Sequence, residues 1–327
     1  MDPLRIALLT NLEEEFTSAS TSNESVFTYE LASALLQSAK NTGGISIDVI
    51  ARKSVAGDLP VISIDPSELG EISVDPLNRF AYQDAIYSLL LLKGMLNEYA
   101  LVHCLAPVVT PILLLAANGI PIVQTITVDS SHPCVDLLPK LAGSRLRQVS
   151  IGAYDLHKNI AAIPPSVDLS RFHPVTKPDD NFIFWPGKKD EKVLMEIKPI
   201  ATSLGLPLYT FEDGNPEDMV KHARLTLYFP NGSLPCEPIW LIRALACGTP
   251  IASWSTPVFK QLFCRTELGI FANKNDITSL KEGIKNILPR DEGTTIRREY
   301  ALGMFGQRSQ AARYRDLYKS FFSELKT

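Results

Sequence analysis

The sequence has little of what would indicate a membrane-spanning, secreted or disulfide-bonded protein. Its longest apolar run, AIYSLLLLKGML near residue 90, contains Lys93 and falls short of the roughly 20 apolar residues that cross a bilayer. The five cysteines show no C-x-x-C spacing, and an odd, scattered set indicates neither a zinc site nor a disulfide framework. The N-terminus, MDPLRIALLTNLEEEF, lacks the basic-then-apolar plan of a signal peptide. We therefore expect a cytoplasmic protein that is not an integral membrane protein, and loose membrane association stays open.

An excess of positive charge is also missing. The net charge of the 327 residues is −4, and no basic stripe dominates, so we expect no nucleic-acid partner. Residues 1–165 hold 10 Lys and Arg against 17 Asp and Glu, whereas the remainder holds 22 against 19. The second half, with its excess of basic residues, is therefore better suited to bind an anionic ligand such as a diphosphate.

Three motifs of well-known enzyme classes are absent. The first predicted strand is followed by NLEEEF instead of the G-x-G-x-x-G of nicotinamide-dependent oxidoreductases, which sets that class aside. No Asp-x-Asp pattern suggests a metal-dependent transferase, because Asp179 and Asp180 lie in a proline-containing connection. No carboxylate pair and no Ser/Cys–His arrangement is visible. We expect neither a metal nor a cofactor.

What the first half does have is a regular alternation of strand and helix patterns. Continuous apolar runs predict strands at residues 5–10, 46–52, 100–106 and 120–127. Between them, SVFTYELASALLQSA and FAYQDAIYSLLLLKGML carry apolar residues three and four apart, which predicts helices. This alternation is typical of a doubly wound parallel sheet.

The segment IPPSVDLSRFHPVTKPDD, residues 163–180, interrupts the alternation with four prolines and reads as an interdomain connection. Strand patterns then resume in NFIFWPG, LPLYTFEDG, LTLYFP and PIASW, and the chain closes with long amphipathic helices. We therefore predict an N-terminal Rossmann-like domain (1–165), a linker (166–178), a C-terminal Rossmann-like domain (179–303) and a C-terminal helix (304–327) that crosses back to the first domain.

The stretch CEPIWLIRALACGTPIA, residues 236–252, carries the most specific pattern. A glutamate, Glu237, precedes an amphipathic helix that ends at Gly248 and Pro250. One interpretation is structural: the acid complements the helix dipole, and the glycine caps the other end. The other is that the helix N-terminus holds an anionic ligand and Glu237 orients the group attached to it.

A second candidate is the turn WPGKKDEK, residues 185–192. Lys188, Lys189 and Lys192 lie between a predicted strand and a predicted helix, where ligands of open α/β sheets bind. Cations at this place would stabilise the charge that develops on a leaving phosphate. A solvated charged turn is the alternative.

Five stretches resemble, in the same order, the motifs of the retaining GT-B glycosyltransferases that carry an E-x7-E motif. IPPSVDLSRFHP is similar to their I-x-N-G-V-D-x-x-x-F-x-P hinge, and WPGKKDEK to their G-R-x-x-x-x-K-G stretch. CEPIWLIRALACGTPIA resembles E-P-F-G-x-x-x-x-E-A-x-A-x-G-x-P-V-V, and LGIFANKNDITSLKEGIKNIL resembles G-x-L-x-x-x-x-D-x-x-x-L-x-x-x-I. MFGQRSQAARYRDLYKSF is similar to the helix that crosses back. The resemblance implies an α/β GT-B fold, with two Rossmann-like doubly wound domains facing each other across a cleft.

The resemblance also assigns roles to residues. Glu237 and Lys192 take the catalytic positions, with Glu237 on the hydroxyls of the transferred sugar. The backbone N–H groups of Ile239 to Leu241 receive the diphosphate, and Lys188 or Lys189 replaces the arginine of the family. The full donor set is Lys188, Lys189, Lys192, Glu237, Pro238, Ile239, Trp240, Leu241 and Arg243. Trp240 either forms a wall of the sugar pocket or belongs to the core.

The sequence departs from the family at several points, as a shortened and divergent member would. The second glutamate of the motif, which binds ribose in the family, is Arg243, and Glu237 lies two residues closer to Gly248 than usual. The Gly-Gly loop after the first strand is replaced around residues 21–25. The remaining acceptor or cleft candidates are Ser22, Asn23, Thr127 and His132.

These observations predict a metal-independent, retaining glycosyltransferase. It would move a sugar, with glucose from UDP-glucose as the first choice, to the hydroxyl of a saccharide or lipid-linked saccharide in polysaccharide or glycoconjugate biosynthesis. The alternative is a non-catalytic GT-B subunit that binds a sugar nucleotide, which Arg243 and the missing glycines favour. A GT-B sugar-nucleotide epimerase also stays open.

Overall fold

In the computed structural model the chain divides into two compact units, which we describe one at a time. Unit 1 is built from Met1–Ile163 and Arg308–Thr327, and unit 2 from Pro164–Ser233 and Glu237–Gln307. The structure describes residues 3–12, 16–17, 20, 22–52, 59–64, 79–127, 133–151, 160–175, 181–187, 191–230, 238–288 and 293–325, with the backbone alone for 79–80, 133–134 and 191–193. Within these ranges no helix combines the length and the apolar content needed to cross a bilayer.

Unit 1 contains a seven-stranded parallel sheet of order β3-β2-β1-β4-β5-β6-β7. Its strands are β1 (Leu4–Leu9), β2 (Ile45–Arg52), β3 (Ile62–Ile64), β4 (Leu101–Cys104), β5 (Ile122–Ile126), β6 (Leu146–Ser150) and β7 (Ala161–Ala162). The four strands predicted in this half are confirmed. Three short strands, β3, β6 and β7, were not predicted.

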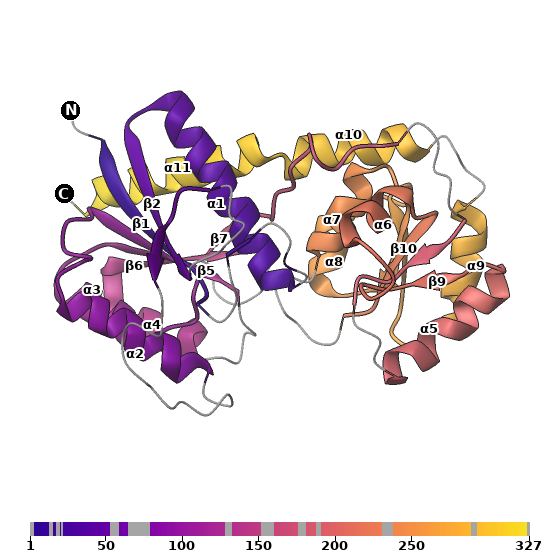
Figure 1. The fold of residues 1–327 in the computed structure, drawn as a ribbon, viewed down its shortest axis with the longest axis horizontal. Helices are drawn as coiled ribbons and strands as arrows, with labels where there is room; N and C mark the ends of the chain where they lie inside the picture. Colours follow the sequence, from indigo (N-terminus) through magenta and orange to yellow (C-terminus); the bar gives the residue numbers. More distant parts are fainter. Residues whose placement is uncertain are drawn as a thin grey trace. The chain divides into compact units, whose positions relative to one another are not determined.

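Helices cover both faces of this sheet (Figure 1). Its helices are α1 (Asn23–Thr42), α2 (Arg79–Leu92), α3 (Thr110–Ala117), α4 (Pro133–Ala142) and α11 (Gln307–Glu324), with a 3-10 turn at Gly143–Arg145. Ile6, Leu8 and Ile47 pack with α1 and α11 on one face. On the other face Ala7 and Val102 pack with α2, α3 and α4. Strands that are buried on both faces explain the continuous apolar runs in the sequence.

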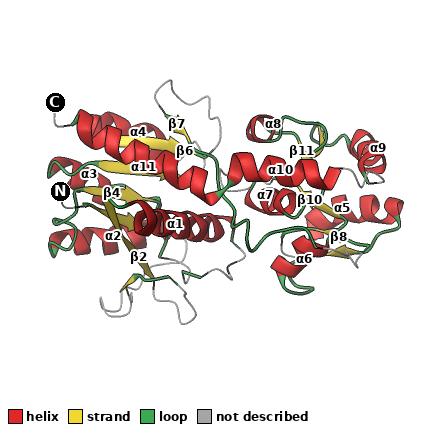
Figure 2. Ribbon diagram, turned by 90° about the horizontal axis from the view of Figure 1, so that it is seen from above, coloured by secondary structure: helices red, strands yellow, loops and turns green. Residues whose placement is uncertain are grey.

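Unit 2 contains a five-stranded parallel sheet of order β12-β11-β10-β8-β9. Its strands are β8 (Ile183–Phe184), β9 (Leu208–Tyr209), β10 (Leu225–Tyr228), β11 (Ile251–Trp254) and β12 (Gly269–Ala272). Its helices are α5 (Glu191–Leu204), α6 (Pro216–His222), α7 (Ile239–Ala246), α8 (Pro257–Leu262), α9 (Ile277–Ile287) and α10 (Gly293–Phe305) (Figure 2). Both sheets are doubly wound, as the sequence predicts.

The segment expected to be a linker packs on unit 2 as far as it is described, to residue 175. Arg298 of α10 donates from Nη1 to the carbonyl of Phe172 at 2.5 Å and from Nη2 to the carbonyl of Leu169 at 2.8 Å. Val167 donates to the carbonyl of Phe305 at 2.9 Å and forms a β-bridge with Gly306. The bridge lies where α10 ends and α11 begins, so the long helical pattern at the end of the chain becomes two helices. From Arg308 onward, α11 belongs to unit 1.

Candidate functional site

Topology marks one place in each unit where a ligand is expected. Doubly wound sheets bind ligands outside the carboxyl ends of their strands, at the point where the strand order reverses. In unit 2 this switch point lies between β8 and β10, and in unit 1 it lies between β1 and β4. The residues that follow these strands are the first to consider.

At the switch point of unit 2 the strand ends carry a layer of aromatic side chains. Trp185 follows β8 and stacks on Tyr228 with ring centroids 5.5 Å apart, and Phe229 follows β10 and stacks on Trp254 at 4.4 Å. Trp185 also contacts Phe229 at 5.8 Å. Only 4 to 8% of each side chain is exposed. Gly187 fits against this layer because a Cβ there would come within 2.4 Å of Nε1 of Trp185.

Helix α7 follows β10 and contacts it, so its N-terminus lies toward the same carboxyl edge of the sheet. Pro238 is the N-cap residue and makes no side-chain cap. The first N–H groups of a helix have no partner within it, which is why those of Ile239 to Leu241 are predicted to receive the diphosphate. Gly248 follows the helix with φ 79°, as a C-terminal cap requires.

Trp240 belongs to the core of unit 2. Only 1% of its side chain is exposed, and its ring lies 5.1 Å from that of Phe211 and 6.1 Å from that of Phe184. The sequence left two alternatives for Trp240, a wall of the sugar pocket or a core residue, and the structure shows the core packing. Its role in donor binding stays a prediction.

Arg243 is buried, with 3% of its side chain exposed. Its guanidinium lies 4.5 Å from the ring centroids of both Phe172 and Trp240, a cation–π arrangement worth about 1 kcal/mol or more when desolvated. The position that holds a ribose-binding glutamate in the family is therefore filled by a cation held between two aromatic rings. Its predicted place in the donor set is not tested.

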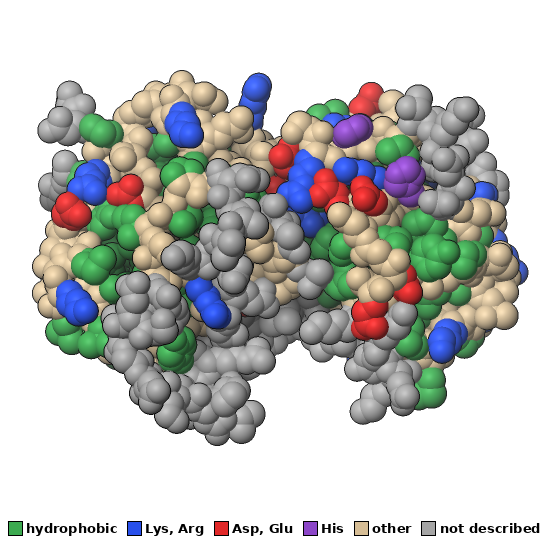
Figure 3. Space-filling view, in the orientation of Figure 1, with side chains coloured by type: hydrophobic (Ala, Val, Ile, Leu, Met, Phe, Trp, Pro, Cys, Tyr) green, Lys and Arg blue, Asp and Glu red, His purple; other side chains and the backbone are tan. Residues whose placement is uncertain are grey.

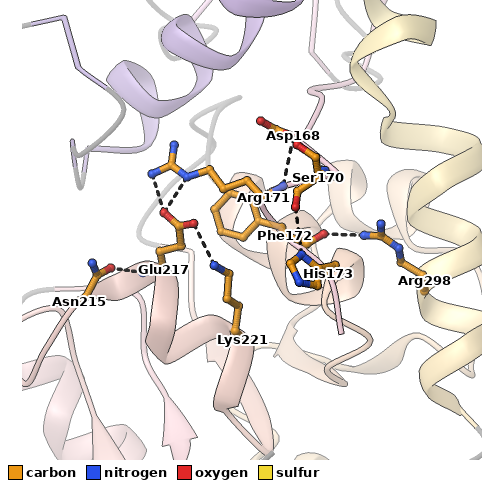
Figure 4. Close-up of polar contacts among 9 residues, drawn as sticks. All are labelled: Asp168, Ser170, Arg171, Phe172, His173, Asn215, Glu217, Lys221 and Arg298. Carbon is orange, nitrogen blue, oxygen red and sulfur yellow. Dashed lines mark hydrogen bonds and ion pairs between the residues drawn. The ribbon is translucent and has the colours of Figure 1, made fainter. Parts of the chain in front are cut away.

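An ion-pair network lies beside the ring of Phe172 (Figure 4). Arg171 donates from Nε to Oε2 of Glu217 at 2.6 Å, and Lys221 donates to Oε1 at 3.0 Å. Burial alone raises the pKa of Glu217, but the hydrogen bonds from Arg171 and Lys221 outweigh burial and hold the pKa below its usual value. Basic and acidic side chains also lie side by side on the visible face of unit 2 (Figure 3). This network fixes segment 164–175 on α6.

Several donor candidates lie outside the described residues. Glu237, Lys188 and Lys189 are among them, and so is the acceptor candidate His132. The backbone of Lys192 lies in the first turn of α5, which follows β8, but its side chain is not described. Among the described residues no group of three or more His, Cys, Asp or Glu is placed to hold a metal ion.

In unit 1 the structure brings Ser22, Asn23 and Thr127 to the switch point. Ser22 caps α1 by accepting from the N–H of Ser25 at 3.2 Å, and Asn23 begins the helix. Thr127, just after β5, places its hydroxyl 3.2 Å from Oε1 of Glu24 and 3.1 Å from the carbonyl of Leu105, which follows β4.

Glu24 is the residue that the sequence analysis missed here. Its carboxylate lies in the first turn of α1, directly after the two candidates Ser22 and Asn23. The contact with the hydroxyl of Thr127 joins the start of α1 to the end of β5. An acid in the first turn of a helix that follows the first strand was the available signal.

Comparisons with solved structures agree with this topology over almost the whole chain. A sucrose-phosphate synthase from Thermosynechococcus elongatus matches with a TM-score of 0.68 and 16% identity, covering 98% of this chain and 99% of that one. HepE from Anabaena, in complex with UDP-glucose, matches with a TM-score of 0.63 and 11% identity over 97% and 99%. WaaG, a glycosyltransferase involved in lipopolysaccharide biosynthesis, matches with a TM-score of 0.60 and 11% identity over 95% and 99%. No protein-family model and no curated protein sequence matches.

At these identities the comparisons show the fold. The two doubly wound units form the GT-B architecture, as the resemblance of the sequence motifs implied.

Proposed function

We propose that this protein is a glycosyltransferase that moves a sugar from a UDP-sugar, with glucose as the first choice, to an acceptor hydroxyl. The reaction proceeds with retention of configuration and without a metal. The acceptor is a saccharide or a lipid-linked saccharide, and the product belongs to polysaccharide or glycoconjugate biosynthesis in the cytoplasm. Unit 2 binds the donor and unit 1 binds the acceptor.

One observation carries the proposal: a fold match over 97% of the chain to a protein described in complex with UDP-glucose. The sequence motifs support it, since WPGKKDEK and CEPIWLIRALACGTPIA follow β8 and β10, the two strands that flank the switch point of unit 2. There, the N-terminus of α7 and the aromatic layer lie at the carboxyl edge of one sheet. Backbone N–H groups suit a diphosphate, and aromatic faces suit a base or a sugar.

The chemistry needs few catalytic side chains. The bond between the anomeric carbon and the β-phosphate oxygen breaks, and its electron pair stays on the phosphate. The acceptor oxygen bonds to the same face of that carbon, and its proton passes to the leaving phosphate. Positive groups at the β-phosphate lower the barrier, which is the role we assign to Lys192 and to Lys188 or Lys189. Glu237 accepts from the hydroxyls of the transferred sugar.

A non-catalytic subunit that binds a sugar nucleotide is the second candidate. It is favoured by Arg243, which is buried between Phe172 and Trp240 where the family has a ribose-binding carboxylate. This candidate predicts binding of UDP without turnover.

The test is calorimetric titration of UDP into the wild type, Glu237→Ala and a control variant, with release of UDP from UDP-glucose followed in parallel. Glu282→Ala is the control, because Glu282 is exposed on α9 and makes no ion pair among the described residues. We expect all three proteins to bind UDP. We also expect Glu237→Ala to lose about 100-fold or more in turnover while the control keeps it.

Binding of UDP by the wild type with no turnover would support the non-catalytic subunit instead. If the wild type binds neither UDP nor other sugar nucleotides, the donor-site assignment fails.

A further inference from the structure

A groove lies in unit 1 between the C-terminal half of α1 and the N-terminal half of α11. Its cavity has a volume of about 320 Å³. Gln37, Ser38 and Asn41 line it from α1, and Arg308, Ala312 and Arg315 line it from α11. Thr42 also contributes, but its hydroxyl donates to the carbonyl of Ser38 at 2.8 Å and is therefore occupied.

The two arginines share one side of α11. Positions 308, 312 and 315 are four and three residues apart, so they lie on one helical face, with the guanidinium-bearing residues about 10 Å apart along the axis. Ala312 between them is small and leaves room for a ligand. Arg308 is exposed and Arg315 is half-buried, and both have long, flexible stems.

Among the described residues, neither arginine has a partner for its charge. Within the described part of the chain, the side chains of Arg308 and Arg315 make no hydrogen bond and no ion pair. Two other arginines of unit 1 are paired: Arg147 with Glu324 at 2.6 Å, and Arg5 with Asp48 and Glu98. No carboxylate lines the groove, and Gln37 and Asn41 bring amide N–H donors to it.

The helix dipole of α1 opposes the binding of an anion here, but its effect is weaker than that of the two arginines. The groove also lies along the last turns of α1, whose C-terminal carbonyls carry roughly half a negative charge. Two full guanidinium charges exceed this, and Lys40 in the last turn of α1 adds a further cation nearby. The charged side chains that line the groove are therefore all basic, although residues 1–165 are acidic as a whole.

We propose that this groove binds a phosphate group, held by Arg308 and Arg315 with the amides of Gln37 and Asn41. Guanidinium groups match phosphate oxygens in paired hydrogen bonds, and the cavity is larger than an inorganic phosphate alone, so a phosphate ester or a diphosphate fits it. The site lies entirely in unit 1 and does not depend on the proposed function. A soluble phosphate compound and the head group of an anionic phospholipid present the same chemistry, and the experiment separates them.

The experiment compares the wild type with the double variant Arg308→Gln/Arg315→Gln and the control Arg313→Gln. Arg313 is an exposed arginine of the same helix that does not line the groove. Inorganic pyrophosphate is titrated calorimetrically into each protein, and each is sedimented with vesicles of phosphatidylcholine, with and without phosphatidylglycerol. Glutamine keeps the helix propensity, and the far-UV spectrum of each variant checks folding.

We expect the double variant to lose at least tenfold in affinity in one of the two arms, while the control stays within twofold of the wild type. Loss in the pyrophosphate arm assigns the groove to a soluble phosphate compound, and loss in the vesicle arm alone assigns it to a lipid head group. Pyrophosphate bound elsewhere, for example in unit 2, contributes equally to all three proteins. The proposal is overturned if the double variant equals the wild type in both arms, or if the control loses as much.

Discussion

The guanidinium of Arg171 donates from Nε to Oε2 of Glu217 at 2.6 Å and joins the segment after β7 to helix α6. Lys221, one turn further along α6, donates to the other carboxylate oxygen. Arg298 holds the same segment from α10 through the carbonyls of Leu169 and Phe172. The proline-containing segment is therefore fastened to unit 2 by charged side chains on two helices.

Replacing Glu217 by Gln should destabilise unit 2 by about 1 kcal/mol at neutral pH, since the pair is only partly exposed. The pKa of the folded-state carboxyl is lowered below 4.5, so the stabilisation is fully present above pH 4.5 and is lost as the pH falls through the folded-state pKa. The difference between wild type and variant should thus shrink as the pH falls below 4.5. Urea unfolding from pH 3 to 7 measures it.

Tryptophan fluorescence is the suitable readout, because Trp185, Trp240 and Trp254 all lie in unit 2. Glu282→Gln, at an exposed position of α9, is the matched control and should match the wild type throughout. A difference for Glu217→Gln that stays constant down to pH 3 would contradict the ion-pair explanation.

The sequence could predict this arrangement only in part. Residues 5–10 and 46–52 are long enough to show continuous apolar character, and β1 and β2 follow them closely. By contrast, β7 and β9 have two residues each, too few to show a period. The C-terminal helix was predicted to begin at residue 304, and α11 begins at Gln307. The bridge between Val167 and Gly306 that separates it from α10 is a tertiary contact, which local pattern does not show.

The candidate site was likewise predictable only in part. Helix α7 and its glycine cap follow from local pattern and were predicted. The position of Arg243 between two aromatic rings was not, because Phe172 lies 71 residues earlier in the chain. The contact between Glu24 and Thr127 spans 103 residues and leaves no trace in spacing.

His103 should make unit 1 less stable in acid. Its ring nitrogens lie 2.6 Å from the hydroxyl of Tyr318 and 2.8 Å from that of Thr125, and burial lowers its pKa from 6.5 to about 3. Between these values the unfolded chain binds a proton that the folded state does not. Stability therefore falls as the pH drops below 6.5, by up to about 1.4 kcal/mol per pH unit, until about pH 3.

The variant His103→Asn should be less stable than the wild type at pH 7, because the contacts with Tyr318 and Thr125 are imperfectly replaced. Its stability should depend less on pH, so the two proteins converge between pH 6 and pH 4. Urea unfolding followed by far-UV circular dichroism measures this. His173→Asn, at an exposed histidine of unit 2, should keep the wild-type dependence. Parallel pH profiles for wild type and His103→Asn would show that His103 is not the group responsible.

Gly248→Ala should destabilise unit 2 by about 2 to 3 kcal/mol, for two reasons. The residue has φ 79°, a left-handed conformation that costs a side-chain-bearing residue about 1 kcal/mol. Its new Cβ would also lie 2.4 Å from Cγ2 of Thr294 on α10, which must shift. Gly205→Ala separates the two effects, since Gly205 has φ 65° and nothing within 4 Å of its Cβ position. Gly205→Ala should therefore lose only the roughly 1 kcal/mol that the left-handed conformation costs.

The same clash predicts a rescue. Thr294→Ser removes Cγ2, so the double variant Gly248→Ala/Thr294→Ser should recover about 1 kcal/mol relative to Gly248→Ala, whereas Thr294→Ser should not stabilise Gly205→Ala. Urea unfolding followed by tryptophan fluorescence gives the free energy of unfolding of each glycine variant, with and without Thr294→Ser, and of the wild type and Thr294→Ser alone. The readout suits both glycines because both lie in unit 2. Equal losses for the two glycine variants, with no rescue, would mean that backbone conformation alone explains the requirement for glycine at 248. A larger loss at Gly248 that Thr294→Ser repairs would show that α7 and α10 pack closely enough to exclude a single methyl group.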